Sequence, residues 1–353
     1  MTPLPSVLLH DHLDGGLRPR TVLELAESGG YHGLPVGDVD RLADWFDQGP
    51  SGSLERYLGA FEHTIAVMQS PEALSRVAEE ALVDLAADGV VYTEQRFAPL
   101  LHTRRGLTPV AVIDAVIAGM ARGAAATGVG WGIIVDAIRS EPDSFLAAEA
   151  AAERAGAGVV GFDLAGPERE FPPHEHLAAI GIAREAGLRI TLHAGEAAGP
   201  ASIASAVLRC ATERIGHGVE VIEDCVVDDG RIVELGAVAS TVRDRRIPLE
   251  LCPTSNLHTK HWTADRHPIG MLYRAGFAVT INTDNRLMSR TSMSDEFDLV
   301  RTHHGFTVDD LATVTRTALD AAFCSHPERR RLWEDRIAPA YRAAGAELTP
   351  LFL

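Results

Sequence analysis

Two histidines and an aspartate lie close together in the segment LLHDHLDGG, which covers residues 8–16. His10 and His12 are two positions apart, and side chains at this spacing on a β-strand point to the same side. Asp14 follows at the end of the apolar run, just before two glycines. Because imidazole is the commonest metal ligand among side chains, the segment predicts a strand that presents metal-binding groups at one end.

Further polar residues follow later apolar runs of the chain. They are His193 and Glu196 in TLHAGE, His217 in IGHG, and Asp284 in TINTDN. Burying four histidines and two acidic residues in one core is costly, since each buried polar group requires a partner. A bound metal ion would satisfy several of them together. A second His-x-His pair, His174 and His176, follows two prolines, and we expect it in a solvent-exposed loop.

Three imidazoles and one carboxylate form a donor set that suits Zn²⁺ and leaves a coordination position open for water. The predicted ligands are His10, His12, His193 and Asp284. A zinc ion lowers the pKa of a bound water molecule, so that hydroxide becomes available near neutral pH. Glu196 remains free to protonate a substrate nitrogen, and His217 to orient or deprotonate the water. Metal, acid and base together predict hydrolytic attack.

One zinc ion per chain is predicted rather than two. Many metal-hydrolase barrels hold two ions that are bridged by a carboxylated lysine on a middle strand. The single lysine of this chain, Lys260, lies beyond the seventh predicted strand, and the fourth strand, VVGFDLAG, offers no bridging residue.

Short runs rich in β-branched residues alternate with helical patterns along the chain, which predicts parallel β-α units. The eight runs cover residues 6–12, 89–97, 130–138, 158–166, 188–196, 213–218, 247–255 and 277–285. Eight such units predict an α/β fold of the TIM (β/α)8 barrel type. A doubly wound open sheet is the alternative, but no G-x-G-x-x-G fingerprint supports it. In a barrel, the carboxyl ends of the strands would bring the polar residues together.

The longest connection, residues 17–88, follows the first predicted strand and has helical patterns. In a barrel this insertion would lie over the mouth as a lid. Its apolar underside could come from Trp45, Phe46, Tyr57 and Phe61, which could instead pack within the helical layer. We expect residues 1–353 to form a single domain.

The composition argues against several classes of protein. A formal charge of −17 would repel nucleic acid, and no run of 18 apolar residues predicts a membrane span. The first residues lack a positively charged region, so a cytoplasmic protein without an obligate protein partner is expected. The cysteines lie too far apart in sequence to indicate a disulfide framework or a cysteine zinc site. They are Cys210, Cys225, Cys252 and Cys324.

Six segments of the chain, in order, resemble the signature segments of the adenosine deaminase family. They are HDHLDG, GFDLAGPE, HAGE, GHG, CPTSN and NTDN, which span residues 10–285. The resemblance implies a zinc-dependent barrel that converts adenosine and 2′-deoxyadenosine to inosine and 2′-deoxyinosine and releases ammonia, a reaction of purine salvage.

The resemblance also implies roles for individual residues. The residues that look like the zinc ligands are His10, His12, His193 and Asp284, of which Asp284 would also be catalytic and His12 would also contact the substrate. Glu196 looks like the proton donor to N1 of the purine, and His217 like the residue that activates the zinc water. Asp14 looks like the contact to a ribose hydroxyl, and Gly166 like the backbone that meets the base.

One residue departs from the family pattern. The family usually has a second aspartate after the metal-binding one, thought to meet N7 of the purine, where this chain has Asn285. The change bears on base recognition, so adenine or a modified 6-amino nucleoside is an alternative substrate. Relatives that act on free adenine tend to have glutamate where Asp14 stands, which favours a nucleoside. A nucleotide would need basic partners, and only Arg18 and Arg20 lie nearby in sequence. A non-catalytic barrel and a two-metal amidohydrolase are the remaining alternatives.

Overall fold

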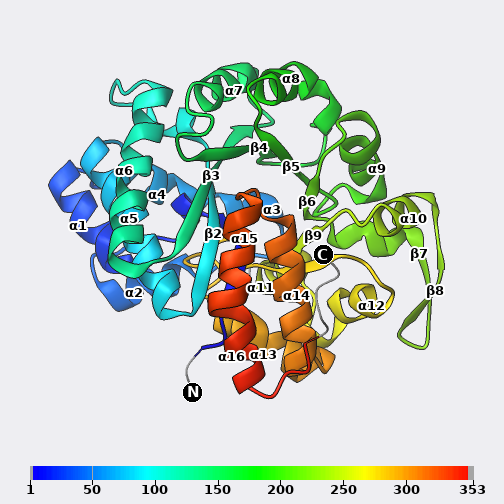
Figure 1. The fold of residues 1–353 in the computed structure, drawn as a ribbon. Helices are drawn as coiled ribbons and strands as arrows, with labels where there is room; N and C mark the ends of the chain where they lie inside the picture. Colours follow the sequence, from blue (N-terminus) through cyan, green and yellow to red (C-terminus); the bar gives the residue numbers. More distant parts are fainter. Residues whose placement is uncertain (1–2, 50, 349–353) are drawn as a thin grey trace.

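Eight parallel strands surrounded by helices form a nearly closed barrel in the computed structural model, which describes residues 3–49 and 51–348 (Figure 1). In their order around the barrel, the strands are β1 (Ser6–His12), β2 (Val90–Phe97), β3 (Gly130–Ile138), β4 (Val159–Ala165), β5 (Arg189–Ala194), β6 (Arg214–His217), β9 (Leu249–Leu251) and β10 (Val279–Ile281). The chain after β10 meets β1, because Asp284 N donates to the His10 carbonyl at 3.0 Å and His12 N donates to the Asp284 carbonyl at 2.7 Å. The predicted TIM barrel is confirmed.

The helices lie outside the strands. They are α1 (Pro19–Gly29), α2 (Val39–Phe46), α3 (Leu54–Leu58), α4 (Phe61–Val67), α5 (Pro71–Ala87), α6 (Pro109–Thr127), α7 (Ser144–Ala152), α8 (Leu177–Glu185), α9 (Gly199–Ala204), α10 (Ala237–Asp244), α11 (Pro253–Lys260), α12 (Ile269–Arg274), α13 (Met293–His304), α14 (Val308–Ala321), α15 (His326–Leu332) and α16 (Ala338–Ala343). The end of α14 and the residues just after it pack on the barrel, where Arg214 Nη1 donates to the Ala321 carbonyl and its guanidinium stacks on Phe323.

Helix α6 is long and apolar enough, by composition, to cross a membrane. It packs instead on α5, and glycines allow the close approach. A Cβ atom added at Gly119 would lie 2.1 Å from the Ser75 carbonyl oxygen, and one at Gly123 would lie 2.8 Å from Cβ of Leu82. The apolar composition of α6 thus matches its place in the outer helical layer of the barrel.

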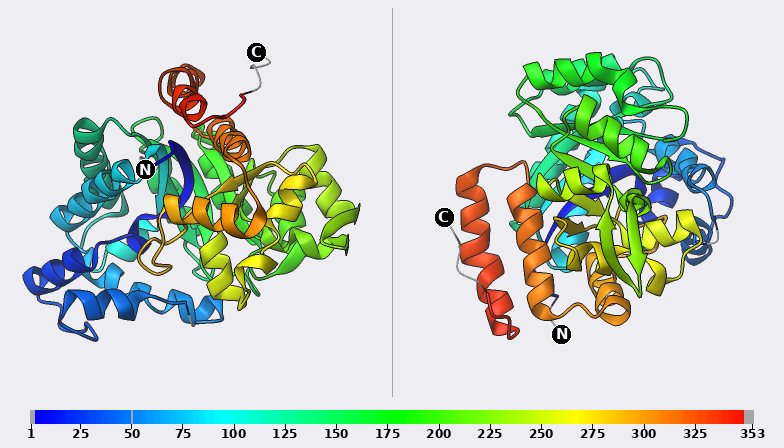
Figure 2. Two further views of the ribbon diagram at one scale, coloured as in Figure 1. Left: turned by 90° about the horizontal axis from the view of Figure 1, so that it is seen from below. Right: turned by 90° about the vertical axis from the view of Figure 1, so that its right-hand side faces the viewer.

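Helices α1 to α5 fill the long connection between β1 and β2, and α1 to α4 gather on one side of the barrel (blue in Figure 2). Tyr57 of α3 and Phe61 of α4 line the cavity at the barrel mouth, as the lid prediction requires. Phe46 is instead fully buried, and Trp45 makes edge-to-face contacts with Phe46 and His63. Of the two alternatives left open by the sequence, Tyr57 and Phe61 line the cavity, and Trp45 and Phe46 pack among the helices.

The last two strands are shorter than the sequence patterns predicted. Residues 247–255 contain only the three-residue β9, because Pro253 begins helix α11 and proline suits the first turn of a helix. Residues 277–285 contain β10, which ends at Ile281 and leaves Asp284 in a loop. The sequence analysis also missed the hairpin of β7 (Cys225–Asp228) and β8 (Arg231–Leu235). Asp229 and Gly230 join them with positive φ angles, and Asp-Gly between β-branched residues is the sequence signal of such a turn.

The second His-x-His pair does not lie in an exposed loop. His176 is buried, and its Nδ1 lies 2.9 Å from Oγ of Ser144, while His174 is partly buried with its Nδ1 3.0 Å from Oγ of Ser205. Both imidazoles therefore have structural partners in neighbouring helical segments, and the expectation of solvent exposure was wrong.

Candidate active site

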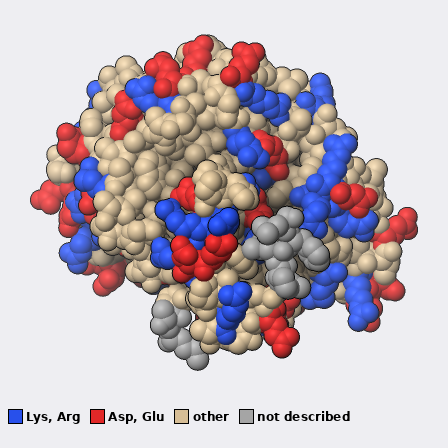
Figure 3. Space-filling view, viewed as in Figure 1, with Lys and Arg blue, Asp and Glu red and all other residues tan. Residues whose placement is uncertain are grey.

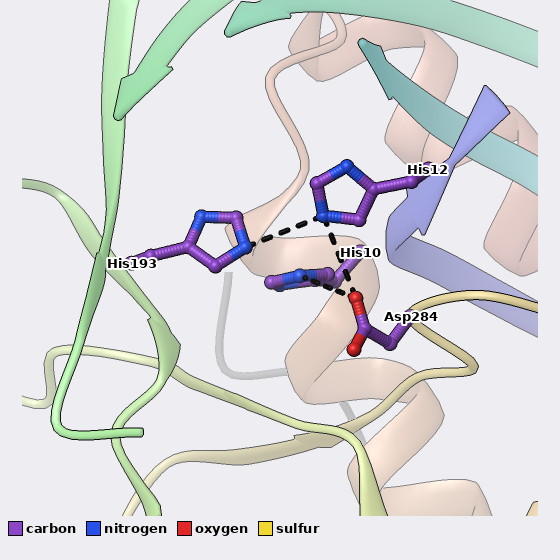
Figure 4. Close-up of side chains that lie close together, drawn as sticks. All are labelled: His10, His12, His193 and Asp284. Carbon is purple, nitrogen blue, oxygen red and sulfur yellow. Dashed lines mark hydrogen bonds and ion pairs between the residues drawn. The ribbon is translucent and has the colours of Figure 1, made fainter. Parts of the chain in front are cut away.

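Four of the predicted residues meet where β1, β5 and β10 end (Figure 4). One ligand-type atom from each of His10, His12, His193 and Asp284 lies within 4.8 Å of the others. Nε2 of His12 is 3.3 Å from Nε2 of His193 and 3.4 Å from Oδ1 of Asp284, which is also 3.3 Å from Nε2 of His10. Zinc bonds of about 2.0–2.1 Å in tetrahedral geometry place neighbouring ligand atoms about 3.3 Å apart. The cluster thus has the chemistry and spacing that a zinc ion requires.

Each of the three imidazoles has a buried carboxylate at its other ring nitrogen. Nδ1 of His10 lies 3.0 Å from Glu250. Nδ1 of His12 lies 3.3 Å from Asp136, and that of His193 lies 2.8 Å from Asp163. Carboxylates in this position orient a ligand imidazole and favour the tautomer that presents Nε2 to a metal.

A fully buried arginine connects two of these carboxylates. Arg96 of β2 donates to Asp163 at 2.6 Å and to Glu250 at 2.8 Å. Glu250 also accepts from Nε of Arg214 at 2.6 Å. Because a buried carboxylate without partners is costly, these guanidinium groups stabilise the charges that orient His10 and His193.

Asp284 is held by its backbone and by a neighbouring hydroxyl. Its φ angle is 62°, in the left-handed region that residues other than glycine seldom adopt, and His217 has a similar φ of 58°. Oγ of Ser255, in the first turn of α11, donates to Oδ2 of Asp284 at 2.6 Å. Strained backbone of this kind persists only where the surrounding structure holds it, and it concentrates at functional sites.

Glu196 and His217 face one another in the same cavity, with Oε2 of Glu196 3.6 Å from Nε2 of His217. Burial raises the pKa of the Glu196 carboxyl well above its usual range, and the nearby charge of Asp284 raises it further. Burial lowers the pKa of the His217 imidazole well below its usual range. A raised pKa favours the protonated carboxyl, which is the form that a general acid requires.

Glu168 positions Glu196, and the sequence analysis assigned it no role. Its carboxylate accepts hydrogen bonds from the backbone N–H groups of Gly195, Glu196, Ala197 and Ala198, at 2.5–3.2 Å. It therefore fixes the turn after β5 that carries Glu196. The segment GFDLAGPE contained the available signal, because an acidic residue after a strand end can bind the N–H groups of a neighbouring turn.

The remaining predicted residues line the same cavity. Asp14 is buried, and its Oδ1 has no hydrogen-bond partner within the described residues, while Oδ2 lies 3.7 Å from Nε2 of His102. Asn285 is likewise buried, and its Oδ1 has no partner there. Gly166 has a φ of 91°, which favours glycine and brings its backbone to the cavity. His102, which lies beside Asp14, was missed by the sequence analysis.

The cavity has an apolar wall, and no lysine or arginine is among the described residues that line it. Its described lining includes Leu54, Leu58, Phe61, Ile65 and Leu101. On the face of the molecule in Figure 3, basic and acidic side chains lie beside one another. The cavity therefore suits an uncharged, partly apolar ligand that carries hydrogen-bonding groups.

A cluster with metal-ligand geometry at the carboxyl ends of barrel strands, next to a buried carboxyl with a raised pKa, is typical of a metal-dependent hydrolase of the TIM-barrel class. Residues 5–339 match the profile of the adenosine deaminase family, and the chain belongs to that family. It is a hydrolytic deaminase.

Individual proteins are similar over nearly the whole chain. The adenosine deaminase of Mycobacterium ulcerans (strain Agy99) is 50% identical over 345 residues, which cover 96% of this chain and 95% of the relative. A crystal structure of adenine deaminase from Arthrobacter aurescens has a TM-score of 0.84 at 25% identity and covers 97% of this chain and all of that one. An amidohydrolase from Burkhoderia ambifaria, with bound Zn, has a TM-score of 0.81 at 25% identity, with coverage of 97% and 92%.

Proposed function

We propose that this enzyme hydrolyses adenosine and 2′-deoxyadenosine to inosine and 2′-deoxyinosine, with release of ammonia and with one zinc ion per chain. The observation that carries the proposal is that three residues of the cluster, His12, His193 and Asp284, line one cavity with Glu196, Asp14 and Asn285. The adenosine deaminase of Mycobacterium ulcerans, at 50% identity, supports the choice of a nucleoside.

The donor set fits zinc. Nε2 of His10 is buried and has no hydrogen-bond partner among the described residues, although Nδ1 of the same ring is bonded to Glu250. Three nitrogens and a carboxylate oxygen are ligands that zinc accepts, and the amidohydrolase with bound Zn has the same fold. When bound there, zinc supplies Lewis acidity that makes water a nucleophile near neutral pH. His10, His12, His193 and Asp284 would hold it.

The side chains around the cluster transfer protons and bind the substrate. Glu196 gives its proton to N1 of the purine, which makes C6 electrophilic. The oxygen of water then adds to C6. One proton of the water returns the Glu196 carboxylate to its protonated form and the other goes to the amino group, so that the C6–N bond breaks and ammonia leaves. His217 contacts the attacking oxygen, since its Nε2 faces the same part of the cavity as Glu196. The backbone at Gly166 and the side chain of Asn285 meet the base.

Asp14 favours a nucleoside over a nucleotide. A buried carboxylate with a free oxygen atom accepts a ribose hydroxyl well, whereas a phosphate needs basic partners and would be repelled. The described cavity lining offers no lysine or arginine. Arg18, which the sequence offered as a basic partner for a phosphate, instead donates to the carboxylate of Asp84. Adenine, the substrate named for the Arthrobacter aurescens relative, is the second candidate because it fits the same base-binding residues.

Segment 17–88 would act as a lid that belongs to one domain with the barrel, and its α3 and α4 would exclude water from the cavity. The composition and the acidic charge support a cytoplasmic enzyme that acts on a small molecule and needs no nucleic acid, membrane or protein partner.

A panel of adenosine, 2′-deoxyadenosine, adenine and AMP tests the proposal, with loss of the ultraviolet aminopurine band as the readout. We expect both nucleosides to be turned over far faster than adenine and AMP. Metal analysis should find about one zinc per chain, and His10→Ala or Asp284→Ala should lose both metal and activity. Faster turnover of adenine or AMP would show that the natural substrate is that compound rather than a nucleoside. Two metal ions per chain would indicate a two-metal hydrolase. Full zinc occupancy in either variant would show that the ligands are wrong.

A further inference from the structure

A chain of buried hydrogen bonds reaches His217 from the side opposite the cavity. The backbone N–H of Ile269, at the start of α12, donates to Nδ1 of His267 at 3.2 Å. Nε2 of His267 lies 3.2 Å from Oδ1 of Asn256 in α11. Nδ2 of Asn256 lies 3.2 Å from Nδ1 of His217. The three side chains that these hydrogen bonds connect are at most 1% exposed.

The backbone N–H of Ile269, at one end of this series of hydrogen bonds, determines the position of every hydrogen in the series. A backbone N–H can only donate, so Nδ1 of His267 accepts, and the hydrogen of the neutral ring lies on Nε2. Burial lowers the pKa of His267 to about 3, which keeps the ring neutral. Its Nε2–H must then donate to the carbonyl oxygen of Asn256, which turns the amide NH₂ toward His217. Nδ1 of His217 therefore accepts a hydrogen bond.

We infer that Asn256 and His267 are positioning residues that hold His217 in one tautomer, with its hydrogen on Nε2 and directed into the cavity. Resting on the proposed function, this inference makes His217 a hydrogen-bond donor to the attacking oxygen rather than the base that takes its proton. The hydrogen bond at one nitrogen of an imidazole sets which nitrogen carries the proton.

The opposite tautomer has no consistent set of partners. A hydrogen on Nδ1 of His217 would face the NH₂ group of Asn256, so that two donors would oppose each other. Turning the amide of Asn256 would move the same conflict to Nε2 of His267, and moving the hydrogen of that ring to Nδ1 would move it to the N–H of Ile269. Each conflict leaves buried polar groups unpaired.

The ring hydrogen of His217 can be observed without any assay of turnover. Zinc-loaded protein with ¹⁵N-labelled histidine would be examined by long-range ¹H–¹⁵N correlation, and the signal lost in His217→Gln would identify the ring. We expect a protonated-nitrogen shift for Nε2 and an unprotonated-nitrogen shift for Nδ1. The reverse pattern would overturn the inference whether or not Asn256 variants fold.

Asn256→Asp tests the positioning role, because a carboxylate can accept from both His267 and His217. The hydrogen of His217 should then move to Nδ1, and kcat should fall about 10- to 100-fold, as for other groups that orient a site residue, with KM little changed. Thr259→Ala is the matched control. Thr259 lies one turn further along α11, and its hydroxyl donates to the Ser255 carbonyl rather than to His217 or His267, so the His217 signals should stay in place.

An unchanged His217 tautomer in Asn256→Asp, or an equal shift in Thr259→Ala, would contradict the positioning role. If the wild-type ring carries its hydrogen on Nε2 but the protein fails to deaminate adenosine, the proposed substrate is wrong while the tautomer assignment stands.

Discussion

Nδ1 of His12 lies 3.3 Å from Oδ2 of Asp136, and both side chains are largely buried at the mouth of the barrel. Burial alone would lower the pKa of His12, but hydrogen bonding and charge from Asp136, together with the charge of Asp284, raise it to about 9 in the metal-free protein. His12 therefore holds a proton at neutral pH that it must release before it can bind a metal ion.

Zinc affinity should consequently rise with pH. Between pH 7 and about 9 we expect about a tenfold increase per pH unit, because one proton leaves as the metal binds, and a plateau above that range. Competition with a chromophoric chelator would measure it. Asp136→Asn should reduce the slope, since the pKa of His12 falls, and should weaken binding about 10- to 100-fold at high pH. An affinity that is constant from pH 7 to 9 would contradict this linkage.

Glu196→Gln should keep zinc and fold and should lose about 10²- to 10⁴-fold in kcat, because the amide cannot give N1 a proton. Initial rates with adenosine, measured alongside zinc content and thermal unfolding, would show whether the loss is chemical. Glu223→Gln, on the 3₁₀ segment after β6, is a suitable control because Glu223 lies outside the cavity lining. Turnover of Glu196→Gln within a few-fold of wild type would remove Glu196 from the mechanism.

The metal cluster was predictable because strand alternation and the convergence of strand ends follow from sequence patterns. His10 and His12 share a side of β1, and a barrel brings His193 to the same end. The carboxylates behind the imidazoles were harder to predict. Glu250 interrupts an apolar run, which signals a buried charge, but its pairing with His10 depends on how strands 240 residues apart meet when the barrel closes. 

Asn256 was missed for a different reason. The sequence analysis extended a strand through residues 247–255, whereas Pro253 begins a helix there. Only the helix places Asn256 beneath His217 and Ser255 beside Asp284. The hydrogen-bond chain through His267 therefore depends on an element that β-branched composition alone did not distinguish from a strand end.

Glu296 should make the protein less stable as the pH rises toward neutrality. It is fully buried, and its carboxyl accepts from the Thr254 backbone N–H at 3.1 Å and from Oγ of Thr291 at 2.7 Å. Burial raises the pKa of Glu296 from 4.5 to about 7. The folded state therefore binds a proton that the unfolded state has lost in this range, and the stabilising effect of that proton disappears between about pH 4.5 and 7.

Glu296→Gln removes this titration, because the amide keeps one acceptor for Thr254 and has no proton to lose. Relative to wild type, the free energy of unfolding of the variant should increase by about 3 kcal/mol between pH 4.5 and 8. Urea unfolding at both pH values would measure the difference. The same difference between variant and wild type at both pH values would show that Glu296 does not titrate in this range.

Asn285 follows the predicted metal ligand Asp284, lines the cavity and is 3% exposed, so its side chain is placed to meet the base of the proposed substrate. It packs directly on Gly15, where a Cβ atom would lie 2.1 Å from its Oδ1, and this contact limits how the amide can move. An aspartate could donate to N7 of the purine only when protonated, whereas the amide NH₂ donates at any pH. A neutral hydrogen bond contributes about 0.5–1.5 kcal/mol, and more is lost when a buried partner is left unpaired.

Asn285→Ala should therefore lower kcat/KM for adenosine by about 10-fold or somewhat more. 7-Deazaadenosine, which has carbon in place of N7, should be a poor substrate for the wild type, and Asn285→Ala should deaminate it no less efficiently than the wild type does. If the wild type deaminates 7-deazaadenosine as efficiently as adenosine, Asn285 does not bind N7, and an asparagine at position 285 would instead indicate a different natural substrate.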